Sequence, residues 1–147
     1  MTDEVIIRIR GTQETDGGKP DEPLEMVAAG MHYLRNGSHY IRYEELLEGY
    51  NQPNVNVVKF TASRFEVIKN GVISANMVFE ENKKNLSVYT TPFGPIRMGI
   101  TATSYVLQEE EDRLSVDVRY VLDMNDAHAS DCELHMEVLP RNREFVL

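Results

Sequence analysis

The sequence predicts an all-β protein folded as a closed, antiparallel up-and-down barrel of about eight to ten strands. Apolar residues recur mostly at a spacing of two, as in LSVDVRYVL, where Leu114, Val116 and Val118 share one face. Two Asn-Gly pairs stand between such runs, and Asn-Gly is favoured in tight hairpins. Each strand must bury one apolar face, and closing the sheet also removes its exposed edges. A two-sheet sandwich is the second architecture that this pattern allows.

The alternation predicts ten extended segments joined by polar connectors of hairpin length. In chain order they are residues 4–10, 24–35, 38–47, 54–61, 63–69, 72–80, 86–91, 95–108, 113–122 and 131–139. The segment YEELLEGY, residues 43–50, could instead form a short helix. Residues 11–23 are too polar and too rich in glycine and proline for either element, so a long surface loop is predicted there.

The stretch TTPFGPIRMGITAT, residues 90–103, combines a strong break with an extended pattern. Pro92 and Pro95 lack a ladder donor and Gly94 can adopt a positive φ, so the chain is predicted to turn there. Gly99, inside the next strand, is predicted to mark a bend or bulge that helps the sheet curl. The stretch is therefore interpreted as a corner between two strands rather than as a ligand loop.

Length and charge limit the classes of function. A chain of 147 residues fits a single β-barrel domain, residues 1–147. Its 24 acidic and 15 basic residues give a net charge of -9, which disfavours nucleic acid and anionic membrane surfaces as partners. No apolar run could span a bilayer as a helix, and the start MTDEVIIRIR lacks the features of a signal peptide. With a single cysteine as well, the prediction is a soluble, cytoplasmic protein.

Several segments together resemble one known family. They are GTQETDGG after the first strand, YIRYEE, the NGV...NMVFE hairpin, TTPFGPIRMGITAT and LSVDVRYVLDMN. Over nearly its whole length the chain resembles the DUF1934 family, also called the YwiB-like family, of small bacterial proteins. The resemblance implies a lipocalin-like, calycin-type β-barrel, but no activity and no role for matching positions such as Tyr43, Glu45 and Thr91. The Gly-x-Trp signature of true lipocalins is impossible here because the chain has no tryptophan.

The segment YIRYEE supplies the main candidate ligand contacts. Ile41, Tyr43 and Glu45 share its more apolar face. If that face points into the barrel, Glu45 needs a cation, several hydrogen bonds or a proton. The favoured interpretation places Glu45 near the strand end, in reach of water, and the alternative hypothesis is that Tyr43 and Glu45 orient the polar end of a small ligand. The full set of candidate contacts is Tyr40, Tyr43, Glu45 and Thr91.

Metal and catalytic motifs are not evident. The four histidines lie on different segments without an H-x-H or HExxH spacing. Glu133, His135 and Glu137 share one strand face, which is interpreted as solvated rather than as a metal site. Cys132 has acidic neighbours that would raise its thiol pKa. No cofactor, metal or catalytic residue is predicted, and a non-enzyme is favoured while an enzyme stays open.

The sequence alone does not establish a function. Methionines on several strands could line a barrel interior, so the leading hypothesis is non-enzymatic binding of a small, partly hydrophobic molecule. The alternative is a protein-interaction module or homodimer whose barrel is solid. A continuous cavity of several hundred Å³ with a few convergent polar groups would favour binding. A packed interior with a large apolar outer patch would favour the alternative.

Overall fold

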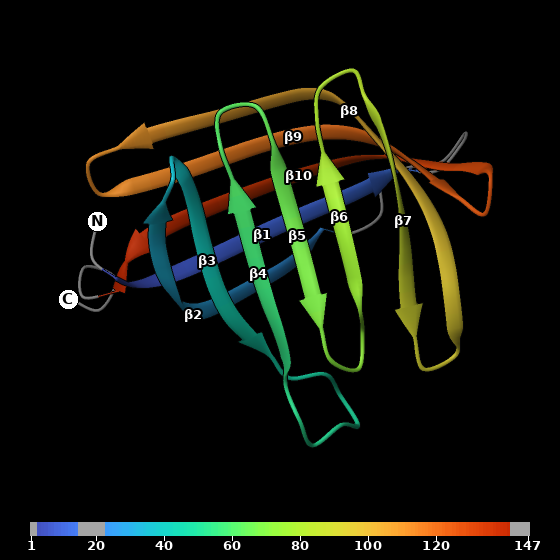
Figure 1. The fold of residues 1–147 in the computed structure, drawn as a ribbon, viewed down its shortest axis with the longest axis horizontal. Helices are drawn as coiled ribbons and strands as arrows, with labels where there is room; N and C mark the ends of the chain where they lie inside the picture. The colour runs from blue at the N-terminus through green and yellow to red at the C-terminus, as the bar shows by residue number, and fades with distance from the viewer. Residues whose placement is uncertain (1–2, 15–22, 142–147) are drawn as a thin grey trace.

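The computed structural model describes residues 3–14 and 23–141, and every regular element in these ranges is a β-strand (Figure 1). This confirms the predicted all-β class. The ten strands are β1 (Glu4–Glu14), β2 (Leu24–Arg35), β3 (Ser38–Glu45), β4 (Asn54–Phe60), β5 (Phe65–Asn70), β6 (Ala75–Phe79), β7 (Lys84–Thr91), β8 (Gly94–Glu110), β9 (Arg113–Met124) and β10 (Ala127–Pro140).

The strands form one antiparallel sheet in the order β6-β5-β4-β3-β2-β1-β10-β9-β8-β7. Neighbours in the sheet are also neighbours in the chain, except for β1 and β10, which pair from Val5–Pro140 to Glu14–Asp131. The connections are therefore those of an up-and-down meander whose first and last strands lie side by side, as the sequence predicts.

β6 and β7 stand at the two ends of this order and close the barrel in part. The backbones of Ser74 and Thr90 exchange two hydrogen bonds of 3.0 and 2.8 Å. A tight turn from Glu80 to Lys83 joins the other ends of the two strands. Between these points, all within the described chain, β6 and β7 form no ladder, and the buried hydroxyl oxygen of Ser87 on β7 has no hydrogen-bond partner there. The barrel is thus nearly closed.

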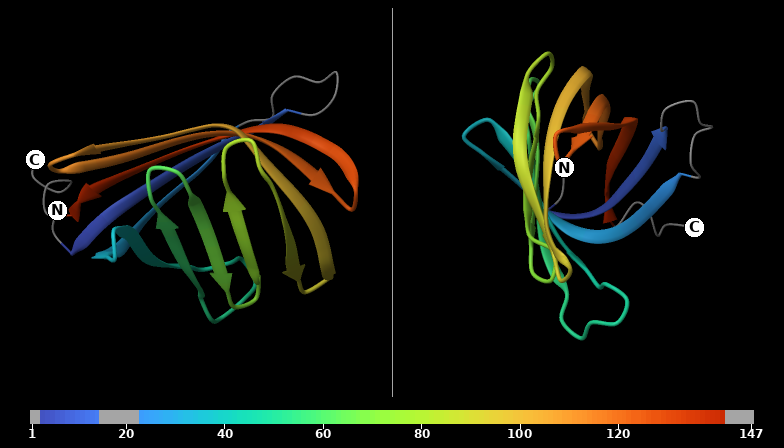
Figure 2. Two further views of the ribbon diagram at one scale, coloured as in Figure 1. Left: turned by 45° about the horizontal axis from the view of Figure 1, so that its top comes forward. Right: turned by 90° about the vertical axis from the view of Figure 1, so that its right-hand side faces the viewer.

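Figures 1 and 2 show two layers of strands that cross at a steep angle, with β3 to β6 in one layer and β1, β9 and β10 in the other. β8 belongs to both layers, since it starts beside β7 and then bends to run along β9 (Figure 1). The ladder between β8 and β9 shifts register between Ala102 and Ser104, and such a bulge increases local bending. No bulge lies at Gly99, because Gly99 pairs in regular register with Leu86 and Asp123, so this part of the prediction was wrong.

Positive φ angles occur where glycine signals predict turns. Asn36 and Gly37, between β2 and β3, have φ of 51° and 79°, as a two-residue hairpin turn requires. Gly94 has φ of 121° and comes directly after the short connection between β7 and β8. The chain therefore turns between these two strands, as predicted. The Asn70-Gly71 pair joins antiparallel strands β5 and β6 as expected, although the connection occupies residues 71–74.

Two predicted segments differ from the structure. Residues 43–50 form no helix: β3 continues through Glu45, and residues 46–53 connect it to β4 without regular structure. The predicted loop over residues 11–23 begins later, because the pairing of β1 with β10 extends to Glu14. Residues 15–22 lie outside the described residues.

Apolar side chains from strands all around the sheet form one core inside the barrel. Phe60, Phe65 and Phe79 form a row whose ring centroids are 6.1 and 5.6 Å apart, and Tyr120 on β9 meets Phe79 edge-on at 4.9 Å. Val5, Ile7, Ile41, Val58, Val116 and Val138 are fully buried around this row. The row connects β4, β5 and β6 to β9 across the interior, so the two layers share one core.

Candidate ligand-binding site

A chain of polar side chains lies inside the other end of the barrel. The Asn56 amide donates to Oε1 of Glu45 at 3.0 Å, and the Lys69 ammonium lies 3.3 Å from the same oxygen. Asn54 stands next to Asn56, with 3.5 Å between the amide nitrogen of Asn54 and the amide oxygen of Asn56. Asn54 also donates to the Ile73 carbonyl at 2.7 Å and accepts from the Ile73 amide at 3.1 Å. Backbone and side chains thus form a continuous hydrogen-bonded chain that ends at Lys69.

Strand alternation places these groups inside. Glu45 on β3 shares a face with Ile41 and Tyr43, both buried, and cross-strand pairs align Tyr43 with Asn56. Asn56 in turn pairs with Lys69 of β5. Each polar residue therefore sits near the end of a strand whose same face is apolar further along, so one end of the interior is polar and the rest is not.

A cavity of about 350 Å³ adjoins this polar chain. Tyr43, Glu45 and Lys69 form its polar side. Its remaining wall is largely apolar and comprises Ile9, Gly11, Leu24, Glu25, Met26, Phe65, Val67, Met77, Phe79, Tyr120 and Leu134. A largely apolar hollow with a few convergent polar groups is the usual form of a small-molecule site, and this volume is at the lower end of the usual range.

Three tyrosines near the site keep their protons at neutral pH. Burial raises the pKa of Tyr43, the nearby carboxylate of Glu45 raises it further, and a hydrogen bond with Asn56 partly offsets these effects. Burial likewise raises the pKa of Tyr89 and of Tyr120, with Glu45 contributing at Tyr89 and Cys132 at Tyr120. These hydroxyl groups are therefore hydrogen-bond donors rather than anions.

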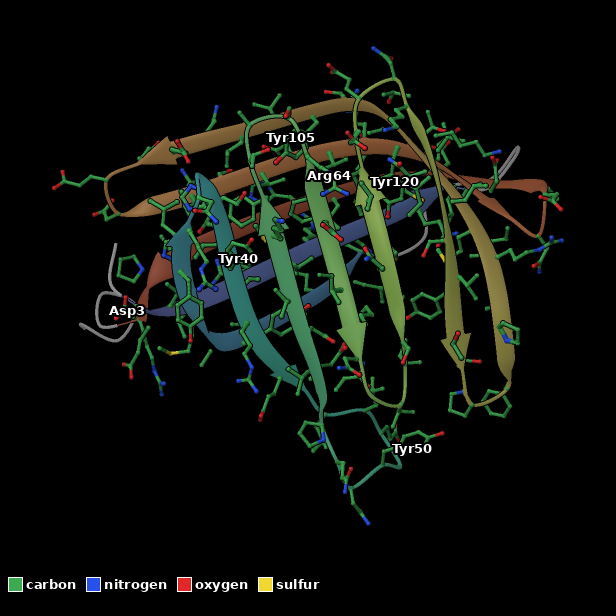
Figure 3. The ribbon with its side chains drawn as sticks, in the orientation of Figure 1. Asp3, Tyr40, Tyr50, Arg64, Tyr105 and Tyr120 are labelled. Carbon is green, nitrogen blue, oxygen red and sulfur yellow. The ribbon has the colours of Figure 1, made fainter. Side chains whose placement is uncertain are left out.

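The structure brings together two of the four residues predicted from sequence. Tyr43 and Glu45 line the cavity. Tyr40 lies on the opposite face of β3, where its ring is 5.4 Å from the Lys59 ammonium (Figure 3). The Thr91 hydroxyl lies in the β7–β8 turn, where it donates to the Gly94 carbonyl at 3.0 Å and accepts from the Phe93 amide. Neither Tyr40 nor Thr91 is among the residues that line this cavity.

Glu45 combines features of both sequence-based interpretations. It is the last residue of β3, and its side chain keeps 27% of its surface exposed. It nevertheless has a cation and an amide donor as partners. A half-buried carboxylate needs such partners, because water alone does not surround it.

Sequence reasoning missed Asn54, Asn56 and Lys69. Both asparagines are completely buried, and the side chain of Lys69 is only 16% exposed. The sequence feature that could have revealed the asparagines is the spacing of two in NVNVVKF, residues 54–60, which puts both of them on the same strand face as Val58 and Phe60. The same alternation also fits a strand that buries Val55 and Val57, so it could not be interpreted without the neighbouring strands.

A second cluster of titratable groups closes the opposite end of the barrel. Nε2 of His32 and Nδ1 of His39 are 2.9 Å apart, and Nε2 of His39 contacts Oε1 of Glu109. The His39 ring stacks on Phe60 at 5.0 Å. Tyr105 donates to the Thr61 carbonyl at 2.5 Å, beside the β4–β5 turn (Figure 3). These contacts hold the end of β8 against β2, β3 and that turn.

The outer stripe of β10 is occupied by ion pairs. His135 contacts Asp117 at 2.7 Å, and Glu137 accepts from Arg113 at 2.8 Å. Within residues 3–14 and 23–141, no group of three or more His, Cys, Asp or Glu side chains is arranged to hold a metal ion. Cys132 is buried, and burial raises the pKa of its thiol. In the same ranges no helix is long and apolar enough to cross a membrane.

Fold and site together define a small, nearly closed antiparallel β-barrel, packed at one end and hollow at the other. The family model described as "Domain of unknown function (DUF1934)" matches residues 7–136, and the chain belongs to this family. The crystal structure of the ywiB protein from Bacillus subtilis is similar, with a TM-score of 0.79 and 17% identity, covering 93% of this chain and 91% of that one. At this identity the likeness shows the fold alone. A search of curated proteins finds no match.

Proposed function

We propose that this protein binds a small, partly hydrophobic molecule inside its barrel and that it does so without catalysis. The observation that supports the proposal is the cavity of about 350 Å³, with Tyr43, Glu45 and Lys69 on one side and methionine and aromatic side chains on the other. An apolar body would gain from burial against the apolar wall, and the polar groups would orient it.

The methionines suit a guest of irregular shape. Met26 and Met77 both line the cavity, and the flexible thioether side chain of methionine adapts to different surfaces. Two tyrosines, Tyr43 and Tyr120, add hydroxyl donors that stay protonated because burial raises their pKa. The wall can thus accommodate a ring or short chain while the polar side fixes its direction.

A fluorescent probe and a pair of adjacent substitutions test this function. Met77 faces the cavity, whereas Val78, the next residue of β6, faces outward. We expect the neutral dye N-phenyl-1-naphthylamine to bind with one-to-one stoichiometry. Met77→Trp should weaken its binding by about tenfold or more by filling the cavity, and Val78→Trp should not. Circular dichroism shows whether each variant is folded. If Met77→Trp does not fold, Met26→Phe is a milder substitution that also fills the cavity.

Two results would contradict the proposal. One is a dye that does not bind the wild-type protein, and the other is equal binding by the inward and outward variants. Native mass spectrometry of protein purified from its own host is an independent test, because it detects a natural guest directly. A bound mass lost in Met77→Trp and kept in Val78→Trp is the expected outcome.

A second candidate function is self-association through the outer face of β7 and the β7–β8 turn. Leu86, Val88 and Phe93 are 80%, 50% and 98% exposed there. Beside them is a hollow of about 360 Å³ over Gly99. The ion pairs Lys84–Asp123 and Arg97–Asp126, each 3.0 Å, border the hollow. With two charges of each sign, this patch is neutral on a chain of net charge -9, so a second copy could face it without repulsion.

Sedimentation velocity over a range of concentrations tests the self-association. A dimer of the wild-type chain that dissociates in Leu86→Glu is expected, because the substitution buries a charge in an apolar contact. Leu34→Glu is the matched control, since Leu34 is similarly exposed on β2, away from this patch. A wild-type chain that stays monomeric at every concentration would exclude this function.

A further inference from the structure

We infer that the cavity takes an uncharged ring compound that has a hydrogen-bond donor and an acceptor on one edge, bound against Glu45 and Lys69. This inference rests on the proposed function and specifies the chemical class of its ligand. It follows from three features of the site: the balance of charge, the hydrogen-bonding groups and the shape of the wall.

The charges at the polar side of the cavity cancel each other, and Glu25, the other charged residue of the wall, forms an ion pair with Arg10 at 3.6 Å. The Lys69 ammonium lies 3.3 Å from the Glu45 carboxylate, and both side chains are largely buried. A ligand with a charged head would have to separate this pair or stand beside a like charge. Either arrangement leaves a charge partly desolvated without its partner, which is strongly unfavourable. The net charge of -9 on the whole chain adds a further penalty for an anion.

The ion pair still offers both kinds of hydrogen bond to a neutral ligand. Asn56 and Lys69 both contact Oε1 of Glu45, so Oε2 of the carboxylate takes neither of these bonds. A lysine ammonium has three donors, and its contact with Glu45 uses one. A neighbouring donor and acceptor on the ligand can therefore bind Oε2 of Glu45 and the Lys69 ammonium without separating the pair.

The opposite wall favours a flat ring. Phe65, Phe79 and Tyr120 present aromatic surfaces, with Phe79 and Tyr120 edge-to-face at 4.9 Å. Met26 and Met77 add sulfur atoms, which make favourable contacts with aromatic ring edges. A cavity of about 350 Å³ has room for a one-ring or two-ring compound rather than a long lipid chain.

Four bicyclic probes of nearly equal size separate charge from shape. They are quinolin-2(1H)-one, which has a neutral donor and acceptor on one edge, 2-naphthoate, naphthalen-2-ylmethylammonium, and naphthalene itself. Each displaces bound N-phenyl-1-naphthylamine in a competition titration. We expect quinolin-2(1H)-one to bind about tenfold or more tightly than either charged probe and than naphthalene.

Substitutions within the ion pair should change this preference in opposite directions. Glu45→Gln leaves the Lys69 charge without its carboxylate, so 2-naphthoate should bind about tenfold more tightly than it binds the wild type. Lys69→Met leaves the Glu45 carboxylate without its cation, so naphthalen-2-ylmethylammonium should bind more tightly than it binds the wild type, by a similar factor. Glu44→Gln is the matched control, because Glu44 is exposed on the outer face of β3 and should alter neither preference.

The outcomes distinguish this inference from the function on which it rests. A charged probe that binds the wild type as tightly as quinolin-2(1H)-one overturns the inference and leaves the binding function intact. The same conclusion follows if none of the four probes displaces the bound dye, or if both ion-pair variants keep the wild-type preference. Failure of the dye itself to bind the wild-type protein overturns both.

Discussion

At the scale of single residues, Asn54 determines the shape of one end of the barrel. Its amide is completely buried and makes a donor and an acceptor bond to the backbone of Ile73, in the connection between β5 and β6. A Cβ on Gly71 would lie 2.6 Å from Oδ1 of Asn54, so the connection passes directly over the amide. One side chain thus replaces the backbone partners that a two-residue turn would supply.

Asn54→Ala is expected to lower the free energy of unfolding by about 2 kcal/mol, because it leaves the partly buried amide and carbonyl of Ile73 without their side-chain partner. Urea denaturation followed by circular dichroism measures the change. Asn76→Ala, on the exposed outer face of β6, is the control and should have little effect. If Asn54→Ala lowers the free energy of unfolding no more than Asn76→Ala does, water replaces the hydrogen bonds of the Asn54 amide without a loss of stability.

At the scale of elements, β8 is the strand that connects the two layers. The residues of β8 that pack in the core lie at even positions up to Ala102 and at odd positions from Tyr105 onward. The bulge between Ala102 and Ser104 keeps both sets facing inward, whereas Val106 is exposed. Near its end, Tyr105 donates a hydrogen bond to the Thr61 carbonyl of the β4–β5 turn. The bend and this contact together close one end of the barrel.

Tyr105→Phe should lower the free energy of unfolding by about 1 kcal/mol, because the Thr61 carbonyl loses a short hydrogen bond while the ring keeps its packing against Phe65. Thermal and urea denaturation measure the loss. Tyr33→Phe is the matched control, since Tyr33 is half exposed on β2. Equal stabilities of the two variants would mean that the contact of β8 with the turn depends on the ring alone.

At the scale of the whole molecule, the two ends of the barrel differ in chemistry. One end is packed around Phe60 and closed by His32, His39 and Glu109. The other holds the Glu45–Lys69 pair and the cavity. Stability should therefore respond to acid through the packed end, where the fold holds a histidine away from water.

The pKa of His32 is lowered in the folded protein, first by burial and then by the nearby His39. Below the ordinary value of 6.5, the unfolded state therefore binds more protons than the fold. The stability associated with neutral His32 is present above that pH and is lost as the pH falls from there through the lowered pKa. His32→Gln keeps a hydrogen-bonding group but removes this titration. The free energy of unfolding of this variant should therefore fall less than that of the wild type between pH 7.5 and 5.5.

Urea midpoints at several pH values test this prediction. His135→Gln, on the outer face of β10, changes a histidine elsewhere and should leave the His32 contribution in place. If the wild type and His32→Gln lose the same stability on acidification, the buried histidine is not a source of the acid sensitivity.

The sequence by itself determined the all-β class, most strand positions and the turns at Asn36-Gly37 and Gly94, because these depend on local alternation and local φ preferences. It also placed Tyr43 and Glu45 on one face of one strand. Only the tertiary structure decided that Asn54, Asn56 and Lys69 join Glu45, and that Tyr40 and Thr91 lie elsewhere. The reason is that alternation divides a strand into two faces, whereas pairing with neighbouring strands selects the buried face and brings distant residues into contact.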